Sequence, residues 1–187
     1  MLGAFTYQPD KQTKVAIQVR EEKKYKNLPQ TNSQSTTQTS AAMRRNVQLK
    51  VSYQAHQNLH FQTTLLGSEF LHQSRNERGS MIAQDINFDA TNHVKVTGRY
   101  ALFDTDSWDT RLYAYERNVW LAYSIPAFGG VGTHWMVMLE CDLPGRVTLW
   151  ARLAATRYDD RTEIGSGADK LIGNVIRDIK FQVRIKL

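Results

Sequence analysis

The stretch DIKFQVRIKL, residues 178–187, alternates apolar side chains with charged or polar ones without interruption. Successive side chains of an extended strand point to opposite faces, so the apolar residues of this stretch share one face. These residues are Ile179, Phe181, Val183, Ile185 and Leu187. Chain ends usually fray unless they are held in place, so a regular strand at the terminus predicts that this end of the chain closes a β-sheet.

The same alternation recurs along the whole chain. Its clearest examples are residues 14–20, 47–53, 59–65, 82–88, 94–102, 134–143 and 147–156. No segment of comparable length has the 3.6-residue apolar period of an amphipathic helix. When the short stretch GAFTYQ (3–8) is counted as part of a further strand, the sequence predicts an all-β fold of about nine strands.

Composition limits the classes of protein. Hydrophobic residues make up 41% of the 187 residues, and no stretch approaches the roughly eighteen apolar residues of a membrane helix, so a helical membrane protein is excluded. The formal net charge of +6 favours anionic partners. The single Cys141 cannot form an intramolecular disulfide. The first ten residues lack the regions of a secretory signal, so export would require residues before Met1.

The connections between the expected strands alternate in length. Short ones, such as QPDKQ (8–12) and PGR (144–146), alternate with expected long loops at 25–43, 71–79, 105–132 and 159–173. Outer-membrane barrels have this asymmetry, and strands of about ten residues are long enough to cross a bilayer. We therefore predict an antiparallel up-and-down (meander) outer-membrane β-barrel. A soluble sandwich or lipocalin-like barrel has the same alternation and remains the alternative.

In such a barrel one face of the sheet contacts lipid and the other lines a water-filled lumen. The residues expected to face lipid are Val137, Leu139, Leu149, Leu153, Ile179, Phe181, Val183 and Ile185. The basic residues expected to face the lumen near mid-strand are Arg99, Arg152, Lys180 and Arg184. Because basic residues outnumber acidic ones on the polar face, we expect a preference for anionic solutes.

Three stretches carry a family resemblance: RYALFDTDSWDTRLYAYERNVWLAYSIPAFGGVGTHW (99–135), LWARLAATRYDDRTEIGSGADKLIGN (149–174) and the terminal DIKFQVRIKL. They resemble the carboxyl-terminal barrel region of Bacteroidota outer-membrane proteins whose amino-terminal part carries helix-hairpin-helix repeats. The resemblance covers most of the chain from about Val47 onward. It implies a location in the bacterial outer membrane, contact with outer-membrane lipid, and contact with the barrel-assembly machinery during insertion.

The resemblance also implies that residues 1–187 are a single β-barrel region and a fragment lacking its amino-terminal part. Nucleic acid would then be bound only through the missing helix-hairpin-helix region. The expected function is that of a porin-like passive pore, a membrane anchor or part of a transport assembly. One alternative is the membrane anchor of an exported DNA-binding protein, and another is a soluble all-β binding protein.

No residue pattern predicts catalysis, a metal site or a cofactor. The stretch DTDSWD (104–109) lacks the central glycine and the acidic twelfth position of a calcium loop. His56 and His60 are four residues apart, a ligand spacing that works on a helix, but they fall in a turn and a strand. Ser124 and Ser166 cannot be assigned to a His and an acid from one sequence. We therefore expect a protein that is not an enzyme.

The longest connection, 105–132, is rich in aromatic residues. The aromatic residues assigned to this external loop are Trp108, Tyr113, Tyr115, Trp120 and Tyr123. Amphipathic rings suit the headgroup level of a membrane, so we expect an interfacial girdle or a cluster on the barrel rim. The other interpretation is a loop that folds inward and narrows the pore. The polar, uncharged run QTNSQSTTQTSAA (30–42) predicts a mobile external loop or weak strand extensions above the membrane.

Overall fold

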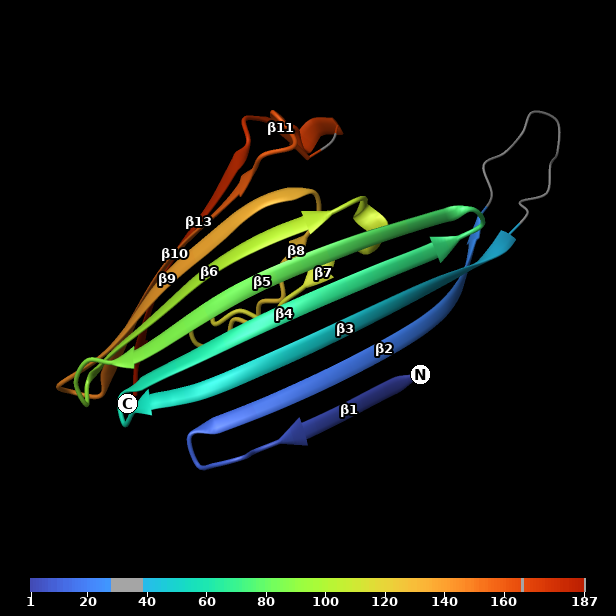
Figure 1. The fold of residues 1–187 in the computed structure, drawn as a ribbon. Helices are drawn as coiled ribbons and strands as arrows, with labels where there is room; N and C mark the ends of the chain where they lie inside the picture. Colours follow the sequence, from blue (N-terminus) through green and yellow to red (C-terminus); the bar gives the residue numbers. More distant parts are fainter. Residues whose placement is uncertain (28–38, 166, 187) are drawn as a thin grey trace.

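The computed structural model of the chain describes residues 1–27, 39–165 and 167–186, and it has the predicted all-β, antiparallel meander (Figure 1). Nine strands form one sheet in the order β1-β2-β3-β4-β5-β6-β9-β10-β13. Their bounds are Leu2–Tyr7 (β1), Thr13–Asn27 (β2), Thr39–His56 (β3), Leu59–His72 (β4), Arg75–Asp89 (β5), Val94–Thr105 (β6), Val131–Leu143 (β9), Val147–Tyr158 (β10) and Val175–Ile185 (β13). Each strand forms an antiparallel ladder with its neighbours.

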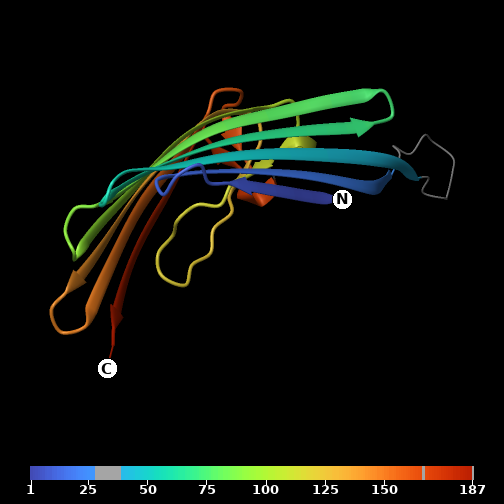
Figure 2. The same cartoon turned by 60° about the horizontal axis from the view of Figure 1, so that its bottom comes forward.

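The sheet is strongly curved and open (Figure 2). Strand β13 pairs with β10 along its whole length, from Val175 opposite Arg157 to Ile185 opposite Val147. The carboxyl-terminal strand is therefore held in the sheet. It forms one edge of the sheet, however, and β1 forms the other, so the terminal strand does not close a barrel here.

Short elements occupy two of the connections. The 3-10 helix η1 (Trp108–Thr110) and the paired strands β7 (Leu112–Tyr113) and β8 (Ala127–Phe128) lie between β6 and β9. Strands β11 (Glu163–Ile164) and β12 (Leu171–Ile172), with the 3-10 helix η2 (Gly167–Asp169), lie between β10 and β13. Within the described ranges no helix has the length and apolar character that a membrane span requires.

Several strands are longer than the sequence predicts. A loop was expected over residues 71–79, but β4 continues to His72 and β5 starts at Arg75, so the connection is a two-residue turn in which Gln73 has a φ of 55°. The expectation was wrong because these strand ends carry polar residues on both faces, with Glu69 and Arg78 on one face and Glu77 on the other. Residues 30–38 of the polar run expected to be a mobile loop lie outside the described residues, and the rest of that run belongs to β3.

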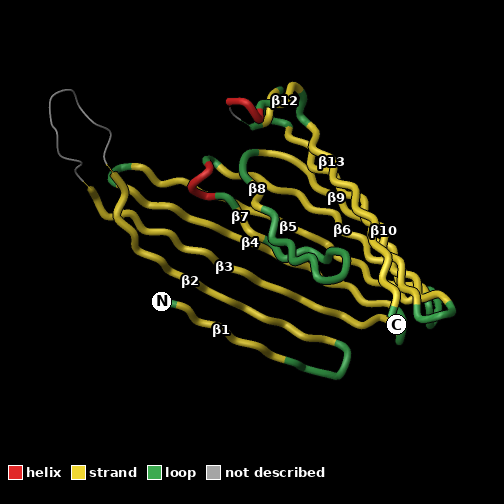
Figure 3. The backbone as a smooth tube through the Cα atoms, turned by 180° about the vertical axis from the view of Figure 1, so that it is seen from behind, coloured by secondary structure: helices red, strands yellow, loops and turns green. Residues whose placement is uncertain are grey.

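The 106–130 connection, called here the inner loop, folds back against the concave face of the sheet (Figures 2 and 3). Apolar residues of the loop meet inward-facing residues of β5, β6 and β10 to form the main hydrophobic core. Its buried members are Met81, Ala83, Ala101, Phe103, Leu112, Ala114, Phe128 and Tyr158. Only 1% of Phe128 is exposed. The expectation of a rim or interface position for this loop is therefore wrong, because its apolar residues pack inside the curve of the sheet.

The contact between the inner loop and β5 can be tested at Gly79. A Cβ atom at this position would lie 2.7 Å from the Thr110 carbonyl oxygen and 2.9 Å from Thr105 Cγ2. We expect Gly79→Ala to lower the free energy of unfolding by about 1–3 kcal/mol, because the loop must shift away. Denaturant titration measures the change.

Gly67→Ala on β4 is the matched control. A Cβ atom there would have no neighbour within 4 Å, so we expect a change below about 0.5 kcal/mol. Equal effects of the two substitutions would contradict the docked position of the loop.

Candidate functional site

The two faces of the sheet have opposite chemistry. The convex face carries apolar side chains that remain exposed, such as Ile179 (74%) and Phe181 (69%). Strand register places all the residues expected to face lipid on this convex side, namely Val137, Leu139, Leu149, Leu153, Ile179, Phe181, Val183 and Ile185. The concave face carries the buried ion pairs and the hydrophobic core, and it is partly covered by the inner loop. A water-soluble protein normally has the opposite arrangement, with charges outside and apolar side chains covered.

A row of ion pairs bounds the apolar area on one side. Glu21, Arg45, Glu69 and Arg78 lie opposite one another on β2, β3, β4 and β5. Arg45 Nε lies 2.9 Å from Glu21 Oε2 and Arg45 Nη1 lies 3.6 Å from Glu69 Oε2. Arg78 Nη2 lies 3.8 Å from Glu69 Oε1. Outward side chains between this row and the short turns are mainly apolar.

Glu116 is the centre of the contact between the inner loop and the concave face. Its side chain comes from the loop and is only 1% exposed. Glu116 Oε1 lies 2.7 Å from Nε2 of His134 on β9, and Oε2 pairs with Nη2 of Arg152 on β10. Arg152 Nη1 in turn lies 2.6 Å from Asp178 Oδ2 on β13. One loop carboxylate is therefore linked to three strands.

A second buried ion pair holds the loop backbone. Arg99 on β6 donates two hydrogen bonds to Asp85 on β5, with distances of 2.6 Å from Nε to Oδ1 and 2.7 Å from Nη2 to Oδ2. Its remaining nitrogen, Nη1, donates to the Tyr115 carbonyl oxygen at 2.7 Å. Paired and hydrogen-bonded in this way, the two charges can remain buried.

The surroundings of Glu116 keep its carboxyl group ionised. Burial by itself would raise the pKa of Glu116. The hydrogen bond and charge of His134, together with the charges of Arg152 and Arg99, outweigh burial and hold the pKa below its ordinary value. The side chain that attaches the inner loop to β9 and β10 is therefore an ionised carboxylate.

The basic residues expected to face the lumen all lie on the concave side, but their charges are engaged. Arg99 and Arg152 are buried beneath the loop with carboxylate partners. Lys180 Nζ lies 3.3 Å from Asp178 Oδ2. The Arg184 guanidinium lies over the rings of Trp120 and Trp150, at 4.7 and 5.1 Å from their centroids.

The aromatic residues of the inner loop lie on the concave side with the loop. Trp120 stacks on Trp150 of β10, with ring centroids 6.4 Å apart and an interplanar angle of 14°. Tyr115 and Tyr123 contact each other at a centroid distance of 5.7 Å. The Tyr113 hydroxyl accepts a hydrogen bond of 2.6 Å from Arg111 Nε, and Trp108 lies under the same guanidinium at 5.0 Å.

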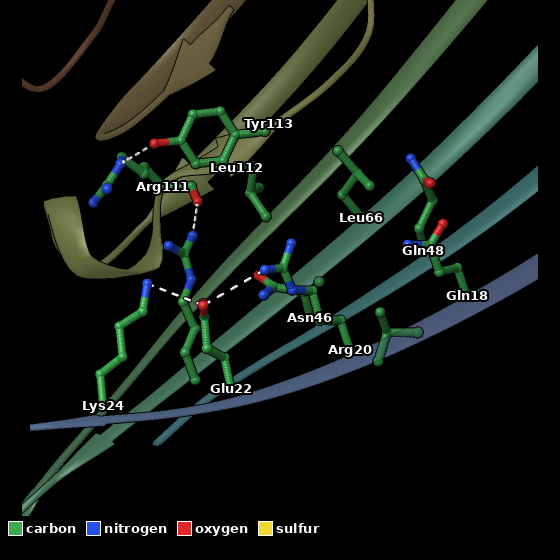
Figure 4. Close-up of a pocket in the computed structure, with 13 residues that line it drawn as sticks. Gln18, Arg20, Glu22, Lys24, Asn46, Gln48, Leu66, Arg111, Leu112 and Tyr113 are labelled. Atoms are coloured by element: carbon green, nitrogen blue, oxygen red, sulfur yellow. Dashed lines mark hydrogen bonds and ion pairs between the residues drawn. The ribbon is translucent and has the colours of Figure 1, made fainter. Parts of the chain in front are cut away.

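Two larger hollows flank the inner loop on the concave face, and a smaller one of about 210 Å³ adjoins the first beside Asp109. One, of about 350 Å³, lies between β2, β3 and β4 on one side and the Arg111–Tyr113 segment on the other (Figure 4). The other, of about 640 Å³, lies toward the short turns and is lined by Gln62, Lys95, Arg117 and Glu140, among others. The concave face thus keeps accessible polar space on both sides of the docked loop.

The residues considered for metal binding or catalysis form ordinary structural contacts. Among the described residues no group of three His, Cys, Asp or Glu side chains could hold a metal ion. His56 Nδ1 lies 2.7 Å from Asn58 Oδ1, and Asp106 accepts a hydrogen bond of 2.8 Å from the Arg78 backbone. Ser124 forms a backbone bridge with Glu116, and Ser166 lies outside the described residues.

Alternation places Asp85 on the polar face as a partial counterweight to the basic residues, but sequence reasoning missed Glu116 and His134 as members of the site. The signal that could have found them is the excess of inward basic residues, which requires carboxylate partners if any of them is buried. Glu116 stands alone in a long loop, and nothing local shows that it reaches across to β9 and β10.

Comparison with known proteins adds no relative: no family model matches the chain, and no curated protein and no solved structure matches it.

The role of Glu116 can be tested by substitution. We expect Glu116→Gln to destabilise loop docking by about 3 kcal/mol, because Arg152 and His134 lose a buried anionic partner. Hydrogen exchange of the backbone amides of residues 112–128 should then accelerate about 100-fold, since 1.4 kcal/mol corresponds to a factor of ten.

Glu140→Gln is the matched control. Glu140 is partly exposed and lies 3.8 Å from Lys95 Nζ, so exchange should accelerate less than about fivefold. Similar exchange rates in the two variants would show that Glu116 does not hold the loop.

The lowered pKa of Glu116 predicts the pH dependence of loop docking. A carboxyl group whose pKa is lower in the docked state stabilises that state fully above its ordinary value of 4.5, and this contribution is lost as the pH falls through the lower value. Tryptophan emission, which reports the Trp120–Trp150 stack, should therefore change below about pH 4.5. Glu116→Gln should remove this transition, and an unchanged transition would assign it to other groups.

Proposed function

We propose that this chain forms part of an outer-membrane β-barrel whose lumen is narrowed by the inner loop, and that it acts as a passive pore or as the pore-forming or anchoring part of a transport assembly. The observation that supports the proposal most strongly is the inverted polarity of the sheet. An exposed apolar face of this size is uncommon in soluble monomers and suits contact with lipid hydrocarbon.

The dimensions of the apolar area fit a bilayer. On β4, the nine residues 59–67 run from the short turn to the last outward residue before the row of ion pairs, and they rise about 27 Å along the strand. At the tilt of roughly 35–45° typical of membrane barrels, this length gives a height of about 20 Å, close to the usual apolar band. Two of the polar side chains within the area, Thr63 and Gln84, hydrogen-bond each other at 2.7 Å.

Aromatic side chains mark the other boundary of the apolar area. Tyr7, Tyr53, Phe61 and Phe88 lie on the convex side near the short turns of their strands. Amphipathic and aromatic rings are enriched at the interfaces of membrane barrels. The apolar area thus has rings along one boundary and ion pairs along the other.

A membrane form requires partners for both sheet edges. Strands β1 and β13 each leave one row of backbone groups without a sheet partner in the described structure. Hydrocarbon cannot hydrogen-bond such groups, so the proposed barrel includes further strands beside β1 and β13. A soluble alternative would instead need a layer over the convex face, and the described residues supply none.

Thiol labelling tests the assignment of the two faces at matched depth. Cys141 lies on the convex face of β9, and the neighbouring residue Glu140 lies on the concave face. The protein is placed in lipid vesicles, and Glu140→Cys is made in a Cys141→Ser background. A membrane-impermeant thiol reagent should react with this introduced thiol at least about tenfold faster than with native Cys141 in the wild-type chain, because hydrocarbon excludes the reagent. Equal labelling rates would refute contact between the convex face and lipid.

A further inference from the structure

Two arginines in the 350 Å³ hollow lack carboxylate partners. Arg44 on β3 donates from Nη2 to the Arg111 carbonyl oxygen. Arg111 donates to the Tyr113 hydroxyl and to the Trp108 carbonyl oxygen, both at 2.6 Å. Within the described part of the chain neither guanidinium forms an ion pair. The two positive charges therefore meet where the inner loop crosses β3, and the nearby Glu22 and Asp109 are paired with Lys24 and Lys26 instead.

The remaining lining of the hollow does not neutralise this charge. Arg20, Lys24, Arg44 and Arg111 stand against a single carboxylate, Glu22. Glu22 Oε1 is already engaged by Lys24 Nζ at 3.0 Å and by Arg20 Nη2 at 3.5 Å (Figure 4). The Nε atom of Arg44 is buried and has no hydrogen-bond partner. A buried donor without a partner costs free energy, which an incoming acceptor would recover.

The two buried arginines of the concave face differ from the half-buried Arg44 and Arg111. Arg99 has Asp85, and Arg152 has Glu116 and Asp178. Carboxylates thus stand beside the two arginines that are buried beneath the loop, whereas the half-buried Arg184 lies over Trp120 and Trp150. Glu22 and Asp109 lie near Arg44 but are paired with Lys24 and Lys26. A mobile anion is therefore the expected partner of Arg44 and Arg111, since guanidinium groups bind carboxylate and phosphate with well-defined geometry.

We propose that this hollow binds a small acidic sugar, with its carboxylate or phosphate group at Arg44 and Arg111. The side-chain amides of Gln18, Asn46 and Gln48 provide donors and acceptors for hydroxyl groups. Figure 4 shows Glu22 and Lys24 at one end of the hollow, Gln18 and Gln48 at the other, and Leu66, Leu112 and Tyr113 along one side. These apolar side chains suit the C–H face of a sugar ring, and the volume lies within the usual range for small-molecule sites.

The inference names a class of solute for the proposed lumen. The claim that this solute is transported rests on the proposed function. Binding itself requires only the folded chain. If the thiol reagent labels the two faces selectively but no acidic sugar binds, the sugar site alone is refuted. If an acidic sugar binds but the thiols on the two faces are labelled at equal rates, the membrane proposal alone is refuted.

The test is equilibrium binding by calorimetry to the full chain in detergent micelles, with glucuronate, glucose 6-phosphate, glucose and inorganic phosphate as probes. We expect at least one of the two acidic sugars to bind at least about tenfold more tightly than glucose, because one charge-assisted hydrogen bond accounts for that factor. The tighter of the two identifies the anionic group. Inorganic phosphate should bind more weakly than the preferred sugar, since it cannot use the amides and the apolar wall.

Substitutions locate the binding site. Arg44→Gln and Arg111→Gln should each weaken binding of the preferred sugar roughly 10- to 100-fold. Arg44→Lys keeps the charge but loses the fork of donors and should have a smaller effect. Arg157→Gln is the matched control, because Arg157 is exposed on β10 and paired with Asp159 at 3.3 Å, and it should leave binding unchanged.

Three results would overturn the inference. The first is that glucose binds as tightly as the acidic sugars, and the second is that inorganic phosphate binds as tightly as either of them. The third is that neither acidic sugar binds to a wild-type chain whose inner loop is protected from hydrogen exchange. The comparison of probes uses the wild-type chain, so it decides the question even if a variant fails to fold.

Discussion

The attachment of Glu116 to Arg152 and His134 is the interaction on which the interior of this molecule depends. A carboxylate that is 1% exposed is unfavourable unless charged and hydrogen-bonding partners surround it, and here they come from β9 and β10. Because Glu116 lies in the middle of the inner loop, its attachment fixes the loop against the concave face. Phe128 and Trp120 then pack on the sheet, and two polar hollows remain at the sides.

The docked loop also divides the basic residues of the concave face into two groups. Arg99 and Arg152 hold the loop, and their charges are paired with carboxylates and are not accessible to a solute. Arg44 and Arg111 lie at the margin of the loop without carboxylates. The anion preference expected of the proposed lumen would therefore come from accessible groups, namely Arg44 and Arg111 at this margin and Lys95 and Arg117 in the other hollow. The sum of charges along the strands overstates it, because Arg99 and Arg152 are buried.

The polarity of the sheet connects these interior features to the proposed membrane location. Charged residues are covered on the concave side while Ile179 and Phe181 stay exposed on the convex side. Burying an arginine beneath a loop requires a compensating carboxylate, whereas leaving apolar side chains exposed is favourable when the surroundings are hydrocarbon. Both halves of the arrangement are consistent with a barrel wall that separates lipid from a hydrated interior.

The sequence by itself determined the strands, their antiparallel order and the facing of their side chains. Alternation has a period of two, so residues such as Val183 and Arg184 are assigned to opposite faces without knowledge of any neighbour. Strand ends were missed at 71–79, because polar residues on both faces leave no alternation to detect. Only the tertiary structure decided where the inner loop lies, that Glu116 meets Arg152, and that Arg44 has no such partner. These contacts join residues far apart in the chain, and local periodicity carries no information about which distant charge compensates which.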